Sequence, residues 1–291
     1  MKTKNLLSLV FVFFVVGFAT AQDDLLNQLD ATAPKQVNIE LAAFKGVQIC
    51  NMQSTKLPAK GEWYFLVSHR FGDLGEGINN FFGLDNALTK IGGIYGVADW
   101  LSLAATRHTY NKTYELAAKY KFANQIVDGF PVTIVGYNTM DINSELKKDA
   151  LLPGLKFNHR LAFTTQLLIP RKFNDSFSLE IAPIYVHKNL YDGLLDQKST
   201  LLLGTGARYK LAKRLSLNLE YAARLNLPED FVSKYRNPLT LGLDIETGGH
   251  VFQLVFSNSQ PMNDTAVFTN ATGRWDGKKQ LYFGFNMYRV F

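Results

Sequence analysis

The side chains that could do acid–base, nucleophilic or metal chemistry are few and widely spaced in this sequence. It has five histidines, and its one cysteine is Cys50. No histidine belongs to an H-E-x-x-H motif or to an i, i+2 pair, so the sequence predicts no metal site and no cofactor. No G-x-S-x-G motif accompanies the serines, so a serine hydrolase is the least favoured interpretation. We therefore expect no enzymatic activity.

The ionisable residues instead alternate with apolar ones. Residues 215–224 read LSLNLEYAAR and residues 239–246 read LTLGLDIE. Apolar side chains occupy every second position of both segments, and Glu220, Asp244 and Glu246 lie on the opposite face. A period of two is typical of a β-strand, because a helix of period 3.6 would scatter both sets around its axis.

Twelve segments show this alternation with more or less regularity. They lie near residues 62–71, 87–96, 100–109, 113–122, 131–139, 157–169, 176–187, 199–211, 215–226, 238–247, 250–259 and 280–291. Soluble strands usually have about five or six residues, whereas a tilted strand that crosses a membrane needs about 9–11, and most of these segments are that long. The sequence therefore predicts an all-β fold, a transmembrane antiparallel up-and-down β-barrel of about twelve strands. Ten or fourteen strands remain alternatives, since Val47–Met52 could form an extra strand.

The connections between these segments alternate in length. Tight turns are expected at 97–99, 170–175, 212–214 and 248–249, and longer loops at 72–86, 140–156, 188–198, 227–237 and 260–279. Short periplasmic turns and longer external loops are typical of outer-membrane barrels. Gly248, Gly249 and His250 fall at a predicted periplasmic turn, where His250 either stabilises the turn or has a proton-linked or ligand-binding role.

The first residues predict the compartment. Lys2 and Lys4 precede the apolar run Leu6–Phe18, which is shorter than the roughly 20 residues of a membrane-spanning helix and is followed by an A-x-A site. We therefore expect residues 1–21 to be a signal peptide that is cleaved after Ala21. Residues 22–61 are then a periplasmic N-terminal segment that could enter the barrel mouth, and residues 62–291 form the barrel in the outer membrane of a Gram-negative bacterium.

The polar faces of the predicted strands predict the lining of the lumen. Charged side chains of both signs occupy these faces. The alternative to a functional role for them is structural pairing across strands. The lumen-lining candidates are Arg70, Lys119, Arg160, Arg208, Glu220, Arg224, Asp244 and Glu246. The formal charge of +6 is not concentrated in one segment, so we expect no nucleic-acid partner.

The sequence ends on LYFGFNMYRVF, with an aromatic residue at its last position. A last strand of this kind resembles the C-terminal signal by which the outer-membrane insertion machinery recognises its clients, and Phe291 is the matching residue. Arg289 departs from that pattern, because the third position from the end is usually aromatic or apolar. We expect Arg289 to reach the headgroup level of the membrane.

Several spaced blocks resemble an uncharacterised family of exported β-barrel proteins from Bacteroidetes-type bacteria. The blocks are Ser68-His69-Arg70-Phe71-Gly72, Thr247-Gly248-Gly249-His250-Val251-Phe252-Gln253, Ser257-Asn258-Ser259 and Phe283-Gly284-Phe285-Asn286-Met287-Tyr288-Arg289-Val290-Phe291. The resemblance covers roughly Phe44 to Phe291. It implies a fold and a location, and it carries over no catalytic residue because the family is a domain of unknown function.

These observations predict a narrow channel or a binding barrel for a small solute, with membrane lipid and the insertion machinery as its other partners. Eight strands leave room only for side chains and 16–18 leave an aqueous channel, so a twelve-stranded lumen could be plugged by charged pairs or by residues 22–61. The alternative is a non-transporting structural, receptor or adhesion barrel that acts through the loops at 72–86, 140–156 and 260–279.

Overall fold

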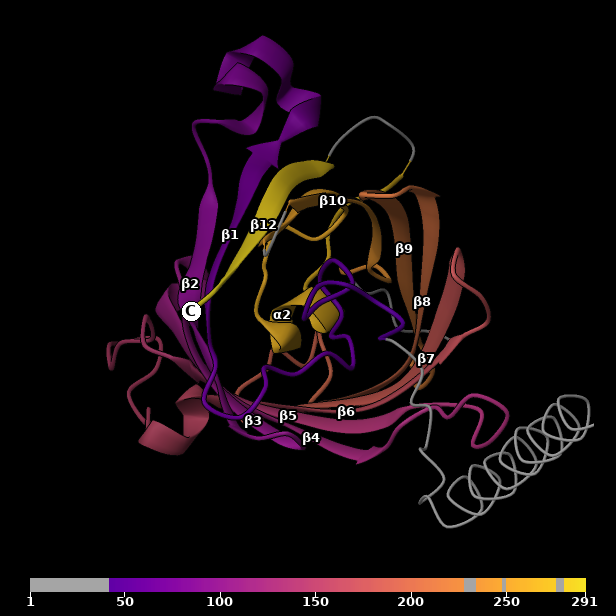
Figure 1. The fold of residues 1–291 in the computed structure, drawn as a ribbon. Coiled ribbons are helices and arrows are strands. Elements are labelled where there is room, and N and C mark those ends of the chain that lie inside the picture. The colour runs from indigo at the N-terminus through magenta and orange to yellow at the C-terminus, as the bar shows by residue number, and fades with distance from the viewer. Residues whose placement is uncertain (1–41, 228–233, 248–249, 276–279) are drawn as a thin grey trace, which may run out of the picture. The chain divides into compact units, whose positions relative to one another are not determined.

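Twelve strands form a ring around a filled interior (Figure 1). The computed structural model describes residues 42–227, 234–247, 250–275 and 280–291. Its strands are β1 (Trp63–Asp73), β2 (Leu88–Ala98), β3 (Leu101–His108), β4 (Thr113–Ala123), β5 (Ile134–Asn143), β6 (Leu161–Lys172), β7 (Phe177–Lys188), β8 (Ser199–Ala212), β9 (Leu215–Arg224), β10 (Leu239–Thr247), β11 (His250–Ser257) and β12 (Tyr282–Val290). Its short helices are η1 (Leu74–Gly83), η2 (Tyr110–Lys112), η3 (Phe157–Arg160) and α2 (Asp264–Thr269).

Each strand pairs antiparallel with its neighbours in sequence, and the pairing of β1 with β12 closes the barrel. At the closing seam, the Phe291 backbone N–H donates to the Trp63 carbonyl at 2.8 Å, and the Trp63 N–H donates back at 3.2 Å. A closed sheet has no free edge, so the backbone groups of every strand find partners within the wall. The fold is therefore the closed, twelve-stranded antiparallel barrel that the alternation predicts.

The two faces of the wall are opposite in polarity. On β9, Leu217 and Leu219 point outward and are 43% and 44% exposed, while Glu220 points inward and is 3% exposed. Trp63 and Phe291 add exposed aromatic rings close to the closing seam. A soluble barrel has apolar residues inside and polar ones outside. The opposite arrangement seen here, with apolar side chains outside, is the one that suits a barrel surrounded by lipid.

The largest departures from the predicted strand bounds occur at two strands. We expected strands over 131–139 and 157–169, but β5 begins at Ile134 and β6 begins at Leu161. The residues before β5 form a turn, in which the Ile126 N–H donates to the Phe130 carbonyl at 2.9 Å, and η3 occupies the residues before β6. The alternative in which Val47–Met52 adds a barrel strand is wrong, because this segment makes no strand pairing with the wall and lies inside it.

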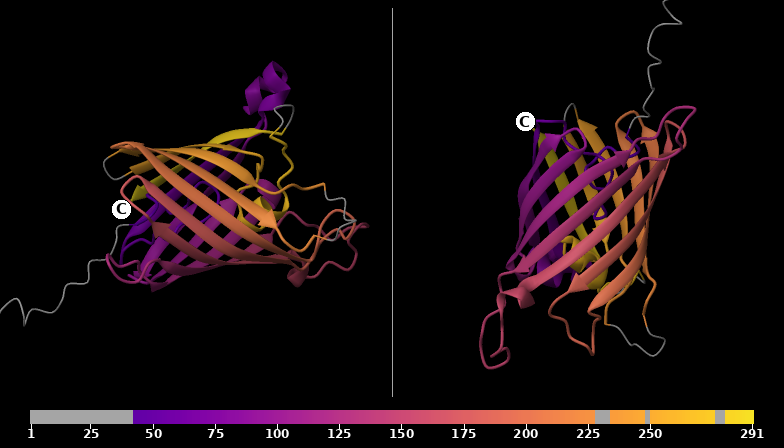
Figure 2. Two further views of the ribbon diagram at one scale, coloured as in Figure 1. Left: turned by 90° about the vertical axis from the view of Figure 1, so that its right-hand side faces the viewer. Right: turned by 90° about the horizontal axis from the view of Figure 1, so that it is seen from below.

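Most connections gather by length at the two ends of the barrel (Figure 2). The exceptions are the short connection 109–112, which lies at the same end as the long loops, and the long connection 124–133, which lies at the other end. We call the end with residues 74–87, 144–160 and 189–198 the long-loop end, and the end with the chain terminus Phe291 the short-turn end. β10 ends at Thr247 and β11 begins at His250, so the predicted turn glycines Gly248 and Gly249 lie outside the described residues.

The predicted signal peptide and its cleavage site also lie outside the described residues, which begin at residue 42. Within the described part of the chain, no helix is long and apolar enough to cross a membrane.

Exchanging an outward leucine for a charged residue should destabilise the barrel in a depth-dependent way. Leu219 lies near the middle of β9 and Leu211 near the short-turn end of β8, and both point outward. Leu219→Arg should cost about 2–4 kcal/mol of unfolding free energy in a bilayer, and Leu211→Arg about 0–1 kcal/mol. Reversible urea unfolding in lipid vesicles measures both values. Equal and negligible costs would show that this face does not meet lipid.

Candidate functional site

Two segments of the chain fill the lumen. We call residues 43–57 the N-terminal insert and residues 258–273 the loop insert; α2 belongs to the loop insert, and both segments lie within the ring of strands in Figure 1. Phe44, Ile49 and Met52 of the first and Phe268 of the second belong to one buried apolar cluster. The lumen therefore contains a packed core of the kind found inside soluble domains.

Glu220 on β9 holds the tip of the N-terminal insert. Its carboxylate accepts three consecutive backbone N–H groups, from Cys50 at 3.1 Å, Asn51 at 2.8 Å and Met52 at 2.9 Å. Successive N–H groups that converge in a turn form a concave anion site, and hydrogen bonds to a charged acceptor stabilise more than neutral ones. The buried charge of Glu220 is thereby compensated by the chain it holds.

Lys119 on β4 holds the opposite side of the same segment. Its ammonium group donates to the carbonyl of Val47 at 3.0 Å and to that of Ser54 at 2.8 Å. Arg70 on β1 completes the contact by donating to the side-chain oxygen of Asn51 at 2.9 Å. A carboxylate binds N–H groups and cations bind carbonyl oxygens, so the wall satisfies both polarities of the insert's backbone.

Glycines on the inward face make room for the insert. A Cβ at Gly206 would lie 2.3 Å from Ile49 Cδ1, one at Gly242 would lie 2.2 Å from Cys50 Sγ, and one at Gly204 would lie 2.6 Å from Met52 Cε. Contacts this short essentially never occur in proteins, so a larger residue at one of these three positions would require the end of the facing side chain to shift.

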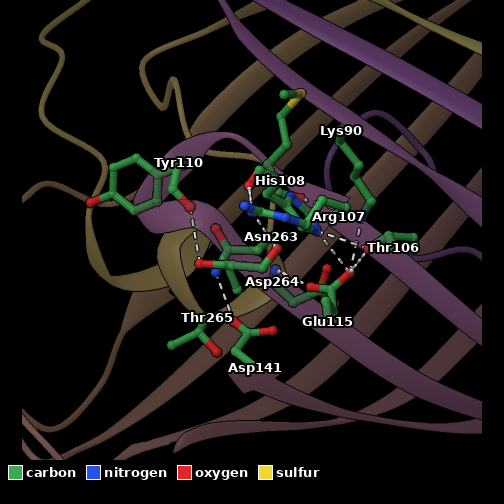
Figure 3. A network of polar contacts seen from close by, with 12 residues as sticks. Lys90, Thr106, Arg107, His108, Tyr110, Glu115, Asp141, Asn263, Asp264 and Thr265 are labelled. Carbon is green, nitrogen blue, oxygen red and sulfur yellow. Dashed lines mark hydrogen bonds and ion pairs between the residues drawn. The ribbon is translucent and has the colours of Figure 1, made fainter. Parts of the chain in front are cut away.

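Glu115 on β4 organises a second network, which holds the loop insert (Figure 3). One carboxylate oxygen accepts the Asp264 backbone N–H at 2.9 Å. The other lies 3.1 Å from Lys90 Nζ and 3.5 Å from His108 Nε2, on β2 and β3. Asn263 extends the network to β5 by donating to Asp141 at 2.7 Å.

Asp264 connects the two inserts. Its carboxyl oxygens accept from Gln53 of the N-terminal insert at 3.3 Å and from Gln166 of β6 at 2.5 Å. Burial, and then the charge of Glu115, raise the pKa of Asp264 to about 7. The link between the inserts therefore contains a carboxyl group that changes charge near neutral pH.

A cavity of about 430 Å³ opens at the long-loop end, and we call it the vestibule. Its wall includes Tyr110, Asp141, Arg160, Lys188 and Tyr191 from the barrel and its loops. The loop insert forms its floor with Asn263, Thr265, Ala266 and Asn270. Among the described residues, no group of three or more His, Cys, Asp and Glu side chains is arranged to hold a metal ion.

The structure divides the eight lumen-lining candidates into separate groups. Arg70, Lys119 and Glu220 contact the N-terminal insert, as described above. Arg208 and Glu246 form an ion pair at 3.2 Å, and Glu246 lies 3.6 Å from Lys45 of that insert.

The other three candidates make different contacts. Asp244 is buried and accepts from Gln253 at 2.7 Å. Arg224 donates to the carbonyl of Thr269 in the loop insert at 2.9 Å. Arg160 lies on η3 rather than on a strand and donates to the Asn143 carbonyl at 3.1 Å, beside the vestibule.

The remaining predicted residues lie at the short-turn end. Arg289 is exposed, and its guanidinium lies 4.7 Å from the centre of the Phe291 ring, which is 67% exposed. His250 pairs through its backbone with Thr247 and Arg289. The role of Phe291 as an insertion signal and the two readings of His250 stay predictions.

Sequence reasoning did not single out Glu115, Lys90 and Asp264, although Glu115 lies on the polar face of a predicted strand. It also missed Glu180 on β7, whose buried carboxyl oxygens have no hydrogen-bond partner among the described residues. The loop over 260–279 was expected outside the barrel. This expectation is wrong for Met262–Thr269, which are buried inside it.

The fold and this lumen define a closed β-barrel with an apolar outer face and an interior filled by its own chain. Residues 44–291 match the family described as "Membrane bound beta barrel domain (DUF5777)". The chain belongs to this family. The matched region begins at the second residue of the N-terminal insert and includes the whole loop insert. No protein with a curated description matches the chain.

Several solved barrels are similar in strand arrangement. The KdgM porin is 10% identical, with 77% of this chain and 98% of that chain covered and a TM-score of 0.47. An outer membrane channel from Pseudomonas putida F1 is 13% identical, with 81% and 97% covered and a TM-score of 0.48. The CymD monoaromatic hydrocarbon channel is 9% identical, with 80% and 89% covered and a TM-score of 0.39.

Neutralising Glu220 should loosen the N-terminal insert, and Cys50 reports this directly because it is the only cysteine and is buried. A hydrogen bond to a charged group contributes about 1.5–3 kcal/mol, so Glu220→Gln should raise the rate of maleimide labelling at Cys50 about ten-fold or more. Asp175→Asn, the same chemical change at an exposed turn, is the matched control. Equal labelling rates in the two variants would show that Glu220 does not hold the insert.

The position of α2 should depend on pH through Asp264. The charged groups that act on it are Glu115, Lys90, Asp141 and Lys119. A folded-state pKa of about 7, above the roughly 3.9 of an unfolded aspartate, means that the protonated carboxyl stabilises the fold; this contribution is complete below about pH 4 and is lost as pH rises through 7.

Amide hydrogen exchange at residues 264–269, corrected for intrinsic rates, should therefore be slower at pH 5 than at pH 8. Asp264→Asn should reduce this difference. Faster corrected exchange at pH 5 would contradict the assignment.

Proposed function

We propose that this protein is an outer-membrane barrel of a Gram-negative, Bacteroidetes-type bacterium that binds a small solute and admits it only when the N-terminal insert moves. In the arrangement described here the lumen is closed by the chain itself. The observation that carries the proposal is the double hold of Glu220 and Lys119 on one short segment that has no strand pairing with the wall.

The hold on the N-terminal insert is strong but reversible. It includes hydrogen bonds between wall side chains and backbone groups of residues 47–54, and water can replace each of these bonds once the segment leaves. A strand of the wall could not leave in this way, because its backbone groups would be unpaired in lipid. The N-terminal insert can therefore leave without unpairing any backbone hydrogen bond of the wall.

The size of the barrel supports passage once the insert leaves. In an eight-stranded barrel the inward side chains alone fill the interior, whereas twelve strands enclose more space. Here the N-terminal insert occupies much of that space. Releasing it would leave a lumen lined by Arg70, Lys119, Arg208, Glu220 and Asp244. Charged groups of both signs suit a small polar solute.

Planar-bilayer conductance tests the proposal. Wild-type protein should be silent or nearly so, and the double variant Lys119→Ala/Glu220→Ala, which removes both holds, should show discrete openings. Labelling of Cys50 in the same preparation shows whether the insert has left, and a variant with Asp175→Asn is the control.

Two results would overturn the proposal. A steady conductance of the wild-type protein would show that the lumen is not closed. Silence of the double variant while Cys50 is fully labelled would show that an empty lumen passes nothing, which favours a non-transporting barrel.

One loop favours that second candidate function. η1 extends beyond the ring of strands at the long-loop end (Figures 1 and 2) and exposes Ile78, Phe81 and Phe82 by 69%, 58% and 55%. Phe81 and Phe82 also have positive φ angles, which bulky residues rarely adopt. A loop that holds exposed aromatic rings in a strained backbone is suited to contact with a partner surface, as in a receptor or adhesion barrel.

A further inference from the structure

We infer that the vestibule binds a neutral, polyhydroxylated solute of mono- or disaccharide size. The inference deepens the proposed function and rests on it for the direction of entry, since the vestibule opens at the long-loop end. The two claims are tested separately, because binding at the vestibule is measured at equilibrium and needs no passage.

The size of the cavity fits a small solute. Its volume of about 430 Å³ lies within the roughly 300–1,000 Å³ of small-molecule pockets in proteins. The vestibule is closed below by the loop insert, so a solute that enters it from the long-loop end stops there. The cavity is therefore a pocket in this arrangement and not a length of channel.

The charges of the wall do not favour an anionic solute. Its two cationic side chains are Arg160 and Lys188, and Lys188 is already ion-paired with Asp196. Asp192 is a second carboxylate of the wall, and Asp141 is buried against Asn263. Two carboxylates therefore match the two cations, and an anion would have to compete with Asp196 for Lys188.

A cationic solute is not favoured either, because the carboxylates are engaged. Asp196 has Lys188 as its partner, and Asp192 accepts the Leu194 backbone N–H at 3.0 Å. Asp141 accepts from Asn263 at 2.7 Å and is 4% exposed. The wall of the vestibule thus offers hydrogen-bonding groups, and it has no excess of unpaired charge of one sign that would attract an ion.

The buried hydrogen-bond acceptors of the vestibule favour a solute that carries donors. The side-chain carbonyl of Asn263 is buried and has no hydrogen-bond partner among the described residues, and the carboxyl group of Asp141 beside it is contacted by the Thr265 hydroxyl. Asn263 and Asp141 are each 4% exposed and line the cavity, and they lie beside each other in Figure 3. Hydroxyl groups are donors and acceptors at once, so a polyol can satisfy such acceptors and also accept from the amides of Asn143 and Asn270.

Tyrosine rings supply the apolar part of the site. Tyr110, Tyr191 and Tyr235 line the cavity, and Tyr191 is 44% exposed. A sugar ring has apolar C–H faces and polar edges, and aromatic rings with a polar tip contact such a molecule on both. Neutral solutes without hydroxyl groups would leave the buried acceptors unpaired, which disfavours them.

The experiment is saturation-transfer NMR and calorimetry on the full protein in lipid nanodiscs, because sugar-headed detergents would occupy the site. The probes are maltose and glucose, with glucuronate as the anionic match and choline as a cation. Maltose should bind saturably and glucose more weakly, with glucuronate and choline weaker still. Tyr191→Ala should weaken maltose binding about ten-fold, the effect expected of one aromatic contact. Tyr209→Ala, an exposed tyrosine on the outer face of β8, should leave it unchanged.

Three results would overturn the inference: no saturable binding of maltose or glucose at millimolar concentrations, tighter binding of glucuronate or choline than of maltose, or equal maltose affinity in Tyr191→Ala and wild type. Saturable maltose binding to a protein that also conducts steadily would support the site while contradicting the proposed closure. A closed barrel that binds neither sugar would do the reverse.

Discussion

A twelve-stranded barrel must fill a lumen that its own side chains cannot fill, and the rest of this structure follows from that constraint. Eight strands close around their side chains, whereas twelve leave space that either water or more chain must occupy. Here two segments that lie far apart in the sequence occupy this space. The N-terminal insert and the loop insert meet at the contact of Gln53 with Asp264, and their apolar side chains join one core with the wall.

The polar inward face then has a structural purpose that alternation alone does not specify. Glu220 and Lys119 could have paired with other wall residues, but each instead compensates its burial by holding backbone groups of the N-terminal insert. Glu115 does the same for the loop insert through the Asp264 N–H. Burial of an unpaired charge is expensive, so each of these side chains requires the insert as much as the insert requires it. The same contacts between wall side chains and inserts therefore close the lumen and compensate its buried charges.

Much of the wall could be predicted from the sequence, because the alternation of one strand depends on local residues and a lipid surface. All twelve strands were found in this way, and so was the inward direction of residues such as Glu220 and Asp244. The inserts could not be found by periodicity. Cys50 contacts a carboxylate 170 residues away, and neither insert pairs as a strand with the wall, so neither has a repeating pattern. The signals available were the lack of a strand pattern in residues 22–61, which led us to place that segment at the barrel mouth, and the inward glycines Gly206 and Gly242, which mark where another part of the chain approaches closely.

The most direct test of the central claim is a cross-link between the N-terminal insert and the wall. A Cβ at position 242 would lie 2.2 Å from Cys50 Sγ, so after a small shift Gly242→Cys would place a second thiol within reach of a disulfide. Mild oxidation of this variant in membranes, followed by digestion and mass spectrometry, should give a peptide linking positions 50 and 242 in most molecules. A folded barrel in which both thiols stay free and react fully with maleimide would contradict a lumen closed by this segment.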